Sequence, residues 1–332
     1  MGSRTASSSL AVLAIVVATL VAGSAARAAT FGACLVMDAG EGNATVDRLA
    51  YAGLLAAERA GVRGRVLRPA SAREYRARLD SCARNGAGLT IGIGTAMQNA
   101  VDAAATADPE HRFAIVGVDV RSLTHRPANV VGLLFKDQEA GYLVGYAAGL
   151  WTKLKGGEAV GSVAAIRTPP VDRFVAGFQF GAAAADPGVK TLSDYSDDPY
   201  DTSACRRKAL QQISQGARVV FDVADRCGTG TLAAVRSHGI FAISVDADRS
   251  RLGPSVMTVA LEHVDVAVRS AVLAAAAGRL RAGTNDVFGA EQGGVGYGTW
   301  SPRVPAAIRT AVARQLALLV EGRIHGIPTT PS

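Results

Sequence analysis

Two stretches of the 332-residue sequence, FAIVGVD at residues 113–119 and FAISVD at residues 241–246, set the pattern of the whole chain. Each is a short apolar run with β-branched residues, typical of a strand that is buried on both faces of a parallel sheet. Runs of this kind alternate with Ala-rich amphipathic stretches from one end of the chain to the other. The sequence therefore predicts an α/β fold.

The expected elements fall into two similar series. Strands of the first series are expected at residues 33–37, 65–67, 89–93, 113–118 and 130–135. Strands of the second series are expected at residues 159–164, 190–194, 219–223, 240–245, 257–260 and 286–289. Amphipathic helices between them are expected at residues 46–60, 72–85, 138–154, 172–185 and 264–278. One sheet of about ten parallel strands would be at the upper limit of common size, so we expect two lobes with a cleft between them.

Residues 1–28 have the pattern of a signal peptide. A polar start is followed by an apolar run, Leu10–Gly23, that is too short to span a bilayer comfortably, and Ala26-Arg27-Ala28 supplies the small residues of a cleavage site. We expect cleavage before Ala29, with an uncleaved membrane anchor as the alternative. Because no cysteine directly follows the apolar run, we expect an exported protein, periplasmic or extracellular, without a lipid anchor.

Charge and aromatic content argue against a nucleic-acid partner. The formal net charge is +7, but the cations are scattered along the sequence and form no basic run. Aromatic residues make up 5% of the chain and do not alternate with basic residues, so the pattern of a base-stacking platform is missing.

Four cysteines in an exported chain predict two disulfides, for which three pairings are formally possible. Cys34 opens the first expected strand and Cys82 closes a helix, and these two points lie at the same edge of an α/β sheet. Cys205 begins a helix and Cys227 follows a strand, so both lie at the opposite edge of the second sheet. Geometry thus favours Cys34–Cys82 and Cys205–Cys227. Reduced buried thiols or a metal site remain the alternative, although no C-x-x-C spacing or histidine cluster is present.

Three aspartates stand at the ends of expected strands, where ligands of open α/β sheets bind. They are Asp38, Asp119 and Asp246, and their carboxylates can accept hydrogen bonds from ligand hydroxyls or amines. Asp38 opens a glycine-containing loop that also holds Asn43. The alternative role for each aspartate is that of a helix cap or turn former.

Two glycine-bearing loops resemble cofactor motifs only in part. The segment around Gly94 and Thr95 lacks the third glycine of a dinucleotide fingerprint, and the loop at Gly228 lacks the lysine of a P-loop. The amides of the second loop can still hold an anionic or carbonyl group. We expect no cofactor. The five histidines lie far apart and neither G-x-S-x-G nor H-E-x-x-H occurs, so an enzyme is not expected either.

Several segments together resemble the basic membrane protein (BMP) family of ABC transporter substrate-binding proteins. The segments are IGIGTAMQNAV at 91–101, NVVGLLFKDQEAGYLVGYAAG at 129–149, RFVAGFQFGAAAADPGVK at 173–190, the CGTG loop at 227–230 and SVD at 244–246. The resemblance implies a type I periplasmic-binding-protein fold, with two Rossmann-like lobes of parallel sheets joined by a three-crossover hinge. The expected N-terminal lobe is 29–135 plus 247–283, and the expected C-terminal lobe is 136–246 plus 284–332.

The resemblance also implies a function. Receptors of this family bind purine nucleosides and deliver them to the permease of an ABC importer. Five residues stand where the family contacts its nucleoside: Asp38, Asn43, Asp119, Gly228 and Asp246. We expect a monomer that binds a small polar solute and does no chemistry on it. The alternative is a ligand sensor coupled to a membrane receptor.

At several of the family's ligand positions this sequence departs from the family pattern. Val46 replaces an aromatic residue, and Thr95-Ala96 follows Gly94 where another aromatic is common. A third aromatic falls on Tyr200 or on the proline before it. Glu262 occupies the place of a lysine, which favours a cationic or donor-rich ligand if the side chain faces the cleft. The alternative is that Glu262 points into solvent and pairs with a surface arginine.

Overall fold

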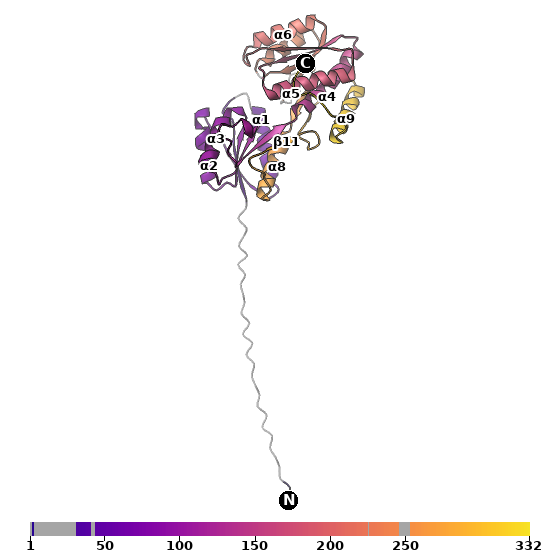
Figure 1. Cartoon of the computed structure of the whole chain (residues 1–332). Coiled ribbons are helices and arrows are strands. Elements are labelled where there is room, and N and C mark those ends of the chain that lie inside the picture. Colours follow the sequence, from indigo (N-terminus) through magenta and orange to yellow (C-terminus); the bar gives the residue numbers. More distant parts are fainter. Residues whose placement is uncertain (1, 3–30, 41–43, 225, 246–252) are drawn as a thin grey trace. The chain divides into compact units, whose positions relative to one another are not determined.

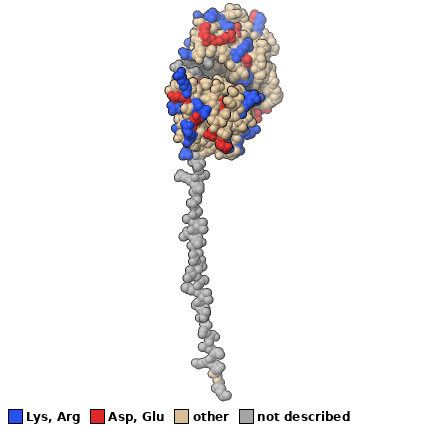
Figure 2. Space-filling model, turned by 60° about the vertical axis from the view of Figure 1, so that its left-hand side comes forward, with Lys and Arg blue, Asp and Glu red and all other residues tan. Residues whose placement is uncertain are grey.

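Two six-stranded sheets organise the chain in a computed structural model, which describes residues 2, 31–40, 44–224, 226–245 and 253–332 (Figure 1). The compact unit spans Phe31–Ser332. The predicted signal peptide lies outside the described residues except for Gly2, and so do Asn43 and Asp246. On the face shown in Figure 2, Lys and Arg side chains are interspersed with Asp and Glu side chains.

The first sheet has the strand order β11-β5-β4-β3-β1-β2, and all its pairings are parallel. Its strands are β1 (Gly32–Val36), β2 (Arg63–Leu67), β3 (Leu89–Ile93), β4 (Phe113–Val116), β5 (Val130–Phe135) and β11 (Asn285–Phe288). Because parallel strands share one direction, the carboxyl ends of all six lie at one edge.

Helices cover both faces of this sheet. One face packs against α1 (Ala44–Glu58) and α8 (Val264–Ala276), and the other against α2 (Tyr75–Arg84) and α3 (Gln98–Ala107). Short 3₁₀ turns precede or follow these elements at η2 (Ala72–Glu74), η3 (Thr95–Met97) and η4 (Val120–Ser122). The alternation of strand side chains decides the faces: Leu35 is buried towards α1, whereas Cys34 is buried towards α2.

The second sheet has the order β12-β10-β9-β8-β6-β7, and only the pairing of β12 with β10 is antiparallel among its described strands. Its strands are β6 (Ala159–Ala164), β7 (Lys190–Tyr195), β8 (Ala217–Val223), β9 (Phe241–Val245), β10 (Val256–Glu262) and β12 (Val295–Tyr297). Its helices are α4 (Asp137–Leu154), α5 (Pro169–Ala185) and α9 (Ala306–Val320) on one face, and α6 (Thr202–Ser214) and α7 (Gly228–Ser237) on the other.

Close contact between α4 and α5 explains two of the segments that carry the family resemblance. Glycines of each helix face the backbone of the other, and a Cβ added at Gly145 would collide with the Phe178 carbonyl oxygen. The reciprocal contact joins Gly181 to the Tyr142 carbonyl oxygen. From α5, Phe178 stacks on Phe221 of β8 with ring centroids 5.0 Å apart. The glycines therefore bring the helices together and the aromatic residues seat them on the sheet.

The chain passes between the sheets three times, which confirms the predicted type I periplasmic-binding architecture. The passages follow β5, β10 and β11. Two strands differ from the predicted lobe boundaries: β10, expected in the N-terminal lobe, pairs with β9, and β11, expected in the C-terminal lobe, pairs with β5. A short apolar run carries no information on which of two sheets it joins, so sequence order alone misplaced both crossovers.

Both predicted disulfides are present. Cys34 pairs with Cys82 at a Cα–Cα distance of 5.7 Å, and Cys205 pairs with Cys227 at 5.6 Å. The first bridge ties β1 to α2, and the second ties the start of α6 to the start of α7. Each bridge stays within the elements of one sheet and its helices, as predicted.

Candidate functional site

Three predicted residues lie at the carboxyl ends of neighbouring strands of the first sheet. Asp38 follows β1, Gly94 follows β3 and Asp119 follows β4, and these strands are adjacent in the order β4-β3-β1. The fold therefore brings the three positions to one edge although 81 residues separate the outer two (119 − 38).

Asp38 is held by a buried tyrosine. The hydroxyl of Tyr75 donates a hydrogen bond to Asp38 Oδ1 and accepts one from the Ala39 amide at 3.0 Å. Burial and the Asp38 carboxylate raise the pKa of the Tyr75 hydroxyl, so this group stays a donor. The Asp38 amide donates to Asp47 Oδ1 at 3.1 Å, and burial raises the pKa of that carboxyl. Tyr75 and Asp47 were not predicted as site residues.

Asp119 is fixed by Arg121 and by Asn285, which comes from a distant part of the chain. Its Oδ1 accepts from the Arg121 amide at 2.9 Å, as a cap of η4, and from Asn285 Nδ2 at 2.7 Å. The Arg121 side chain is the main cause that lowers the pKa of Asp119 below its ordinary value, with Asn285 assisting. Asn285 Oδ1 in turn accepts from the Val120 amide at 3.0 Å. Asp119 thus caps a 3₁₀ turn, which was the alternative to a ligand-binding role, and it is also an ionised carboxylate at a strand end.

The loop after β3 depends on a glycine. Gly94 has φ +78°, a left-handed backbone that strains any residue with a Cβ, and its amide donates to the Val116 carbonyl of β4 at 3.0 Å. Thr95 then begins η3 with its side chain exposed. The loop therefore presents a hydroxyl between the ends of β1 and β4, where the family more often has an aromatic ring.

At the second sheet, Gly228 and Tyr200 have different environments. Gly228 begins α7 and is buried, and a Cβ added there would collide with the carboxylate of Asp222, itself fully buried in β8. Tyr200 lies before α6 with 69% of its surface exposed, and its amide donates to Asp198 Oδ1 at 2.8 Å. The glycine is thus required by packing, whereas the tyrosine ring is available for contact.

Glu262 ends β10, and its side chain is one of the groups that act on the pKa of Asp137, the first residue of α4. Arg173 of α5 reaches Asp137 Oδ2 with Nε at 2.8 Å and Nη2 at 2.7 Å. The Asp137 side chain is 1% exposed, and this burial raises its pKa against the opposing effects of Glu262 and Arg173.

A second interaction at the strand ends of this sheet was also not predicted. The guanidinium of Arg167, which follows β6, lies 4.0 Å from the ring centroid of Tyr195 at the end of β7. The Tyr195 hydroxyl donates a hydrogen bond to Asp172 Oδ1 at 2.5 Å. The pKa of Tyr195 is raised, mainly by burial. The strand ends of the second sheet therefore carry an arginine, a phenol and the Glu262 carboxyl group as possible ligand contacts.

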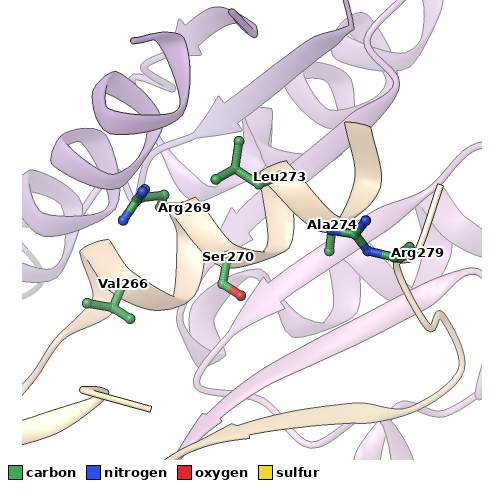
Figure 3. A pocket seen from close by; sticks show the side chains of 6 residues that line it. All are labelled: Val266, Arg269, Ser270, Leu273, Ala274 and Arg279. Carbon is green, nitrogen blue, oxygen red and sulfur yellow. The ribbon is translucent and has the colours of Figure 1, made fainter. Parts of the chain in front are cut away.

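The strand-end groups described above are hydrogen-bond donors and acceptors. Within the described residues, no group of three or more His, Cys, Asp and Glu side chains is placed to hold a metal ion. None of the described helices is both long and apolar enough to cross a membrane. One shallow hollow of about 310 Å³ lies along α8, lined by Arg269 and Arg279 among others (Figure 3).

The fold and the strand-end groups define a class, the type I solute-binding proteins. A solved structure of ABC transporter solute-binding proteins from Aeropyrum pernix K1 superimposes with a TM-score of 0.68 at 23% identity, covering 90% of this chain and 94% of that chain. A further solute-binding protein structure, from Conexibacter woesei, gives a TM-score of 0.72 at 21% identity and covers 91% and 100%.

A family model described as Bmp, ABC transporter substrate-binding protein PnrA-like, matches residues 47–318. The chain belongs to this extracytoplasmic family. It is similar to the ABC transporter nucleoside-binding protein BmpA of Lactococcus lactis, with 26% identity over 280 residues that cover 79% of this chain and 76% of that protein. These findings confirm the resemblance to the BMP family.

Proposed function

We propose that this protein is the solute-binding component of an ABC importer and captures a nucleoside-like or otherwise donor-rich polar solute at the carboxyl ends of its strands. The observation that carries the proposal is the convergence of Asp38, Thr95 and Asp119 on adjacent strand ends of the first sheet. The naming of the Lactococcus relative as nucleoside-binding supports the solute class. In this proposal a membrane permease receives the solute, and the protein leaves it chemically unchanged.

The two carboxylates of the first sheet suit a ligand that carries hydroxyl groups. Arg121 and Asn285 keep Asp119 ionised and fixed in direction, and Tyr75 orients Asp38. Carboxylates held in this way lose little conformational entropy when they accept hydrogen bonds from a ligand. A sugar hydroxyl pair is the group that we propose for them.

The second sheet is proposed to select the remaining part of the ligand. Glu262, at the end of β10, can accept a hydrogen bond from a ligand amine. The exposed ring of Tyr200 can cover an apolar or aromatic ligand face. Since Thr95 and Val46 supply no ring, we propose weaker stacking and more hydrogen bonding than in aromatic-rich sites.

Native mass spectrometry of freshly purified protein tests this proposal, because tight solute-binding proteins can retain their ligand. We expect a bound species of small mass whose fragments contain a sugar or another polyhydroxylated group. Incubation with a panel of nucleosides, followed by chromatography, should return every compound unchanged. Conversion of any bound solute to a product would contradict the proposal.

A further inference from the structure

A second hollow lies at the amino-terminal edge of the second sheet, opposite the strand ends described above. It encloses about 550 Å³ and is lined by Trp151, Lys155, Arg218, His238, Gly239, Ile240 and Arg303. These residues come from the end of α4, the start of β8, the turn between α7 and β9, and the segment before α9. This volume is in the range of small-molecule pockets.

The lining is cationic and contains no carboxylate. Lys155, Arg218 and Arg303 are all exposed, and no described carboxylate forms an ion pair with any of them. The acidic residue nearest in sequence to Lys155, Glu158, is paired with Lys190 at 3.5 Å. Three permanent positive charges around one hollow repel one another, and an anion would relieve this repulsion.

Aromatic rings hold two of these cations. The Lys155 ammonium lies 4.8 Å from the Trp151 ring centroid, and the Arg303 guanidinium lies 4.7 Å from the Phe241 centroid. Trp151 and Phe241 meet edge to face with centroids 4.8 Å apart, so one aromatic pair supports both charges. Cation–π contacts of this kind orient a cation without occupying its hydrogen-bond donors as a carboxylate would.

Helix ends explain only part of this arrangement. Lys155 caps α4 and His238 caps α7, and a cation at a helix carboxyl terminus is favourable in itself. Arg218 lies at the start of a strand and Arg303 lies in a loop, so neither compensates a helix end. Two cations therefore need another explanation.

We propose that this hollow binds a phosphate-bearing ligand. Lys155, Arg218 and Arg303 would hold the phosphoryl group, and Trp151 with Ile240 would contact the carbon-bearing part of the ligand. A free organic phosphate and the headgroup of an anionic phospholipid share this chemistry. The hollow lies at the other edge of the sheet from the proposed solute site, so it is a separate site.

Tryptophan fluorescence tests the proposal with inorganic pyrophosphate as the probe. The chain has two tryptophans, so Trp300→Phe leaves Trp151 as the only reporter. We expect pyrophosphate to change the Trp151 emission in a saturable manner. The double variant Lys155→Gln/Arg218→Gln should raise the apparent Kd about tenfold or more, because two charged hydrogen-bond donors are lost.

A matched control variant removes two positive charges at a different place on the protein. Arg269→Gln/Arg279→Gln also deletes two exposed arginines, from the hollow along α8 (Figure 3), and should leave the Kd unchanged. Equal weakening in both double variants would show non-specific attraction and overturn the proposal. So would a flat titration of the Trp300→Phe protein.

Vesicles distinguish the two sources of the phosphate. Co-sedimentation with phosphatidylcholine vesicles that contain phosphatidic acid, reversed by pyrophosphate and absent in Lys155→Gln/Arg218→Gln, would assign a lipid headgroup. Pyrophosphate binding without vesicle binding would assign a free phosphate compound. Each of these results supports the proposed phosphate site, and binding to neither probe contradicts it.

Discussion

Asp119 in the first sheet and Asp137 at the second are both paired with an arginine, yet their pKa values shift in opposite directions. The Asp119 side chain is 32% exposed and its pKa is lowered, mainly by Arg121. The Asp137 side chain is 1% exposed and its pKa is raised, mainly by burial. An arginine partner therefore does not fix the protonation state of a carboxyl group, because desolvation competes with it.

The difference has a functional meaning for the proposed solute site. The lowered pKa of Asp119 favours its charged form, whereas burial raises the pKa of Asp137 and favours its protonated form. In the proposed site the ionised Asp119 can therefore only accept hydrogen bonds, for example from ligand hydroxyl groups. In this proposal the raised pKa of Asp137 makes the charge of the second sheet depend on pH.

The largest expected effect is on stability, when the arginine partner of Asp137 or of Asp119 is removed. Arg173→Ala leaves Asp137 buried without its cation, and breaking a buried pair costs about 3–5 kcal/mol of unfolding free energy. Arg121 is 78% exposed, so Arg121→Ala should leave stability close to wild type. Urea denaturation of both variants measures the difference. Equal losses of unfolding free energy in the two variants would show that burial does not make the Asp137–Arg173 pair more important for stability than the Asp119–Arg121 pair.

A second test uses pH. Since the Asp137 pKa is raised on folding, the folded state keeps a proton that the unfolded state releases, and Asp137 lowers stability as pH rises from about 4 through its folded pKa. Asp119 has a lowered pKa, so its contribution is present above about pH 4 and is lost as pH falls below that value.

Denaturation profiles of Asp137→Asn and Asp119→Asn over this pH range separate the two contributions. The first variant should lose the decline of stability with rising pH, and the second should lose part of the decline at acid pH. The slopes are compared with wild type, so other titrating groups cancel. An unchanged slope in Asp137→Asn would contradict the raised pKa of Asp137.

A third and smaller effect concerns selectivity. Glu262→Lys would place an ammonium beside Asp137 and make the second pair resemble Asp119, with cations as its partners. We expect weaker binding of the native donor-rich ligand and stronger binding of ordinary purine nucleosides, each by about tenfold if one charged hydrogen bond is exchanged. Calorimetry on both proteins measures this exchange, with Glu262→Gln as the isosteric control. Unchanged affinity for both ligands would exclude Glu262 from recognition.

Much of the fold could be predicted from the sequence because its signals are local. Apolar runs, amphipathic stretches and strand-end aspartates predicted two α/β halves, and the order of elements predicted both disulfides, now seen at Cys34–Cys82 and Cys205–Cys227. Sheet membership of β10 and β11 could not be predicted, because pairing depends on contacts between distant segments. The three passages of the chain between the sheets were predicted in number, and the first of them, after β5, was also predicted in place. The passages after β10 and β11 were placed too early in the sequence.

The site could be predicted only in its strand-end positions. The partners that orient each carboxyl group or shift its pKa come from elsewhere in the sequence. Asn285 bonds to Asp119, Tyr75 bonds to Asp38, and Arg173 pairs with Asp137. Glu262 also acts on the pKa of Asp137. Asp137 stands directly after an apolar strand, in the same kind of position as the predicted aspartates, and this signal was available. No local pattern indicates that Glu262 will act on the pKa of Asp137, a carboxyl group 125 residues earlier in the chain (262 − 137).

The most direct test of the account is calorimetric titration of the protein with purine and pyrimidine nucleosides, alongside Asp38→Asn and Asp80→Asn. Asp38 lies at the proposed site, whereas Asp80 pairs with Arg76 on the surface of α2 and serves as the matched control. The account predicts saturable binding of at least one nucleoside at one site per chain, weakened about tenfold or more in Asp38→Asn only. Binding that Asp38→Asn leaves intact would contradict the proposed site, and no binding of any nucleoside would exclude the nucleoside-like solute class.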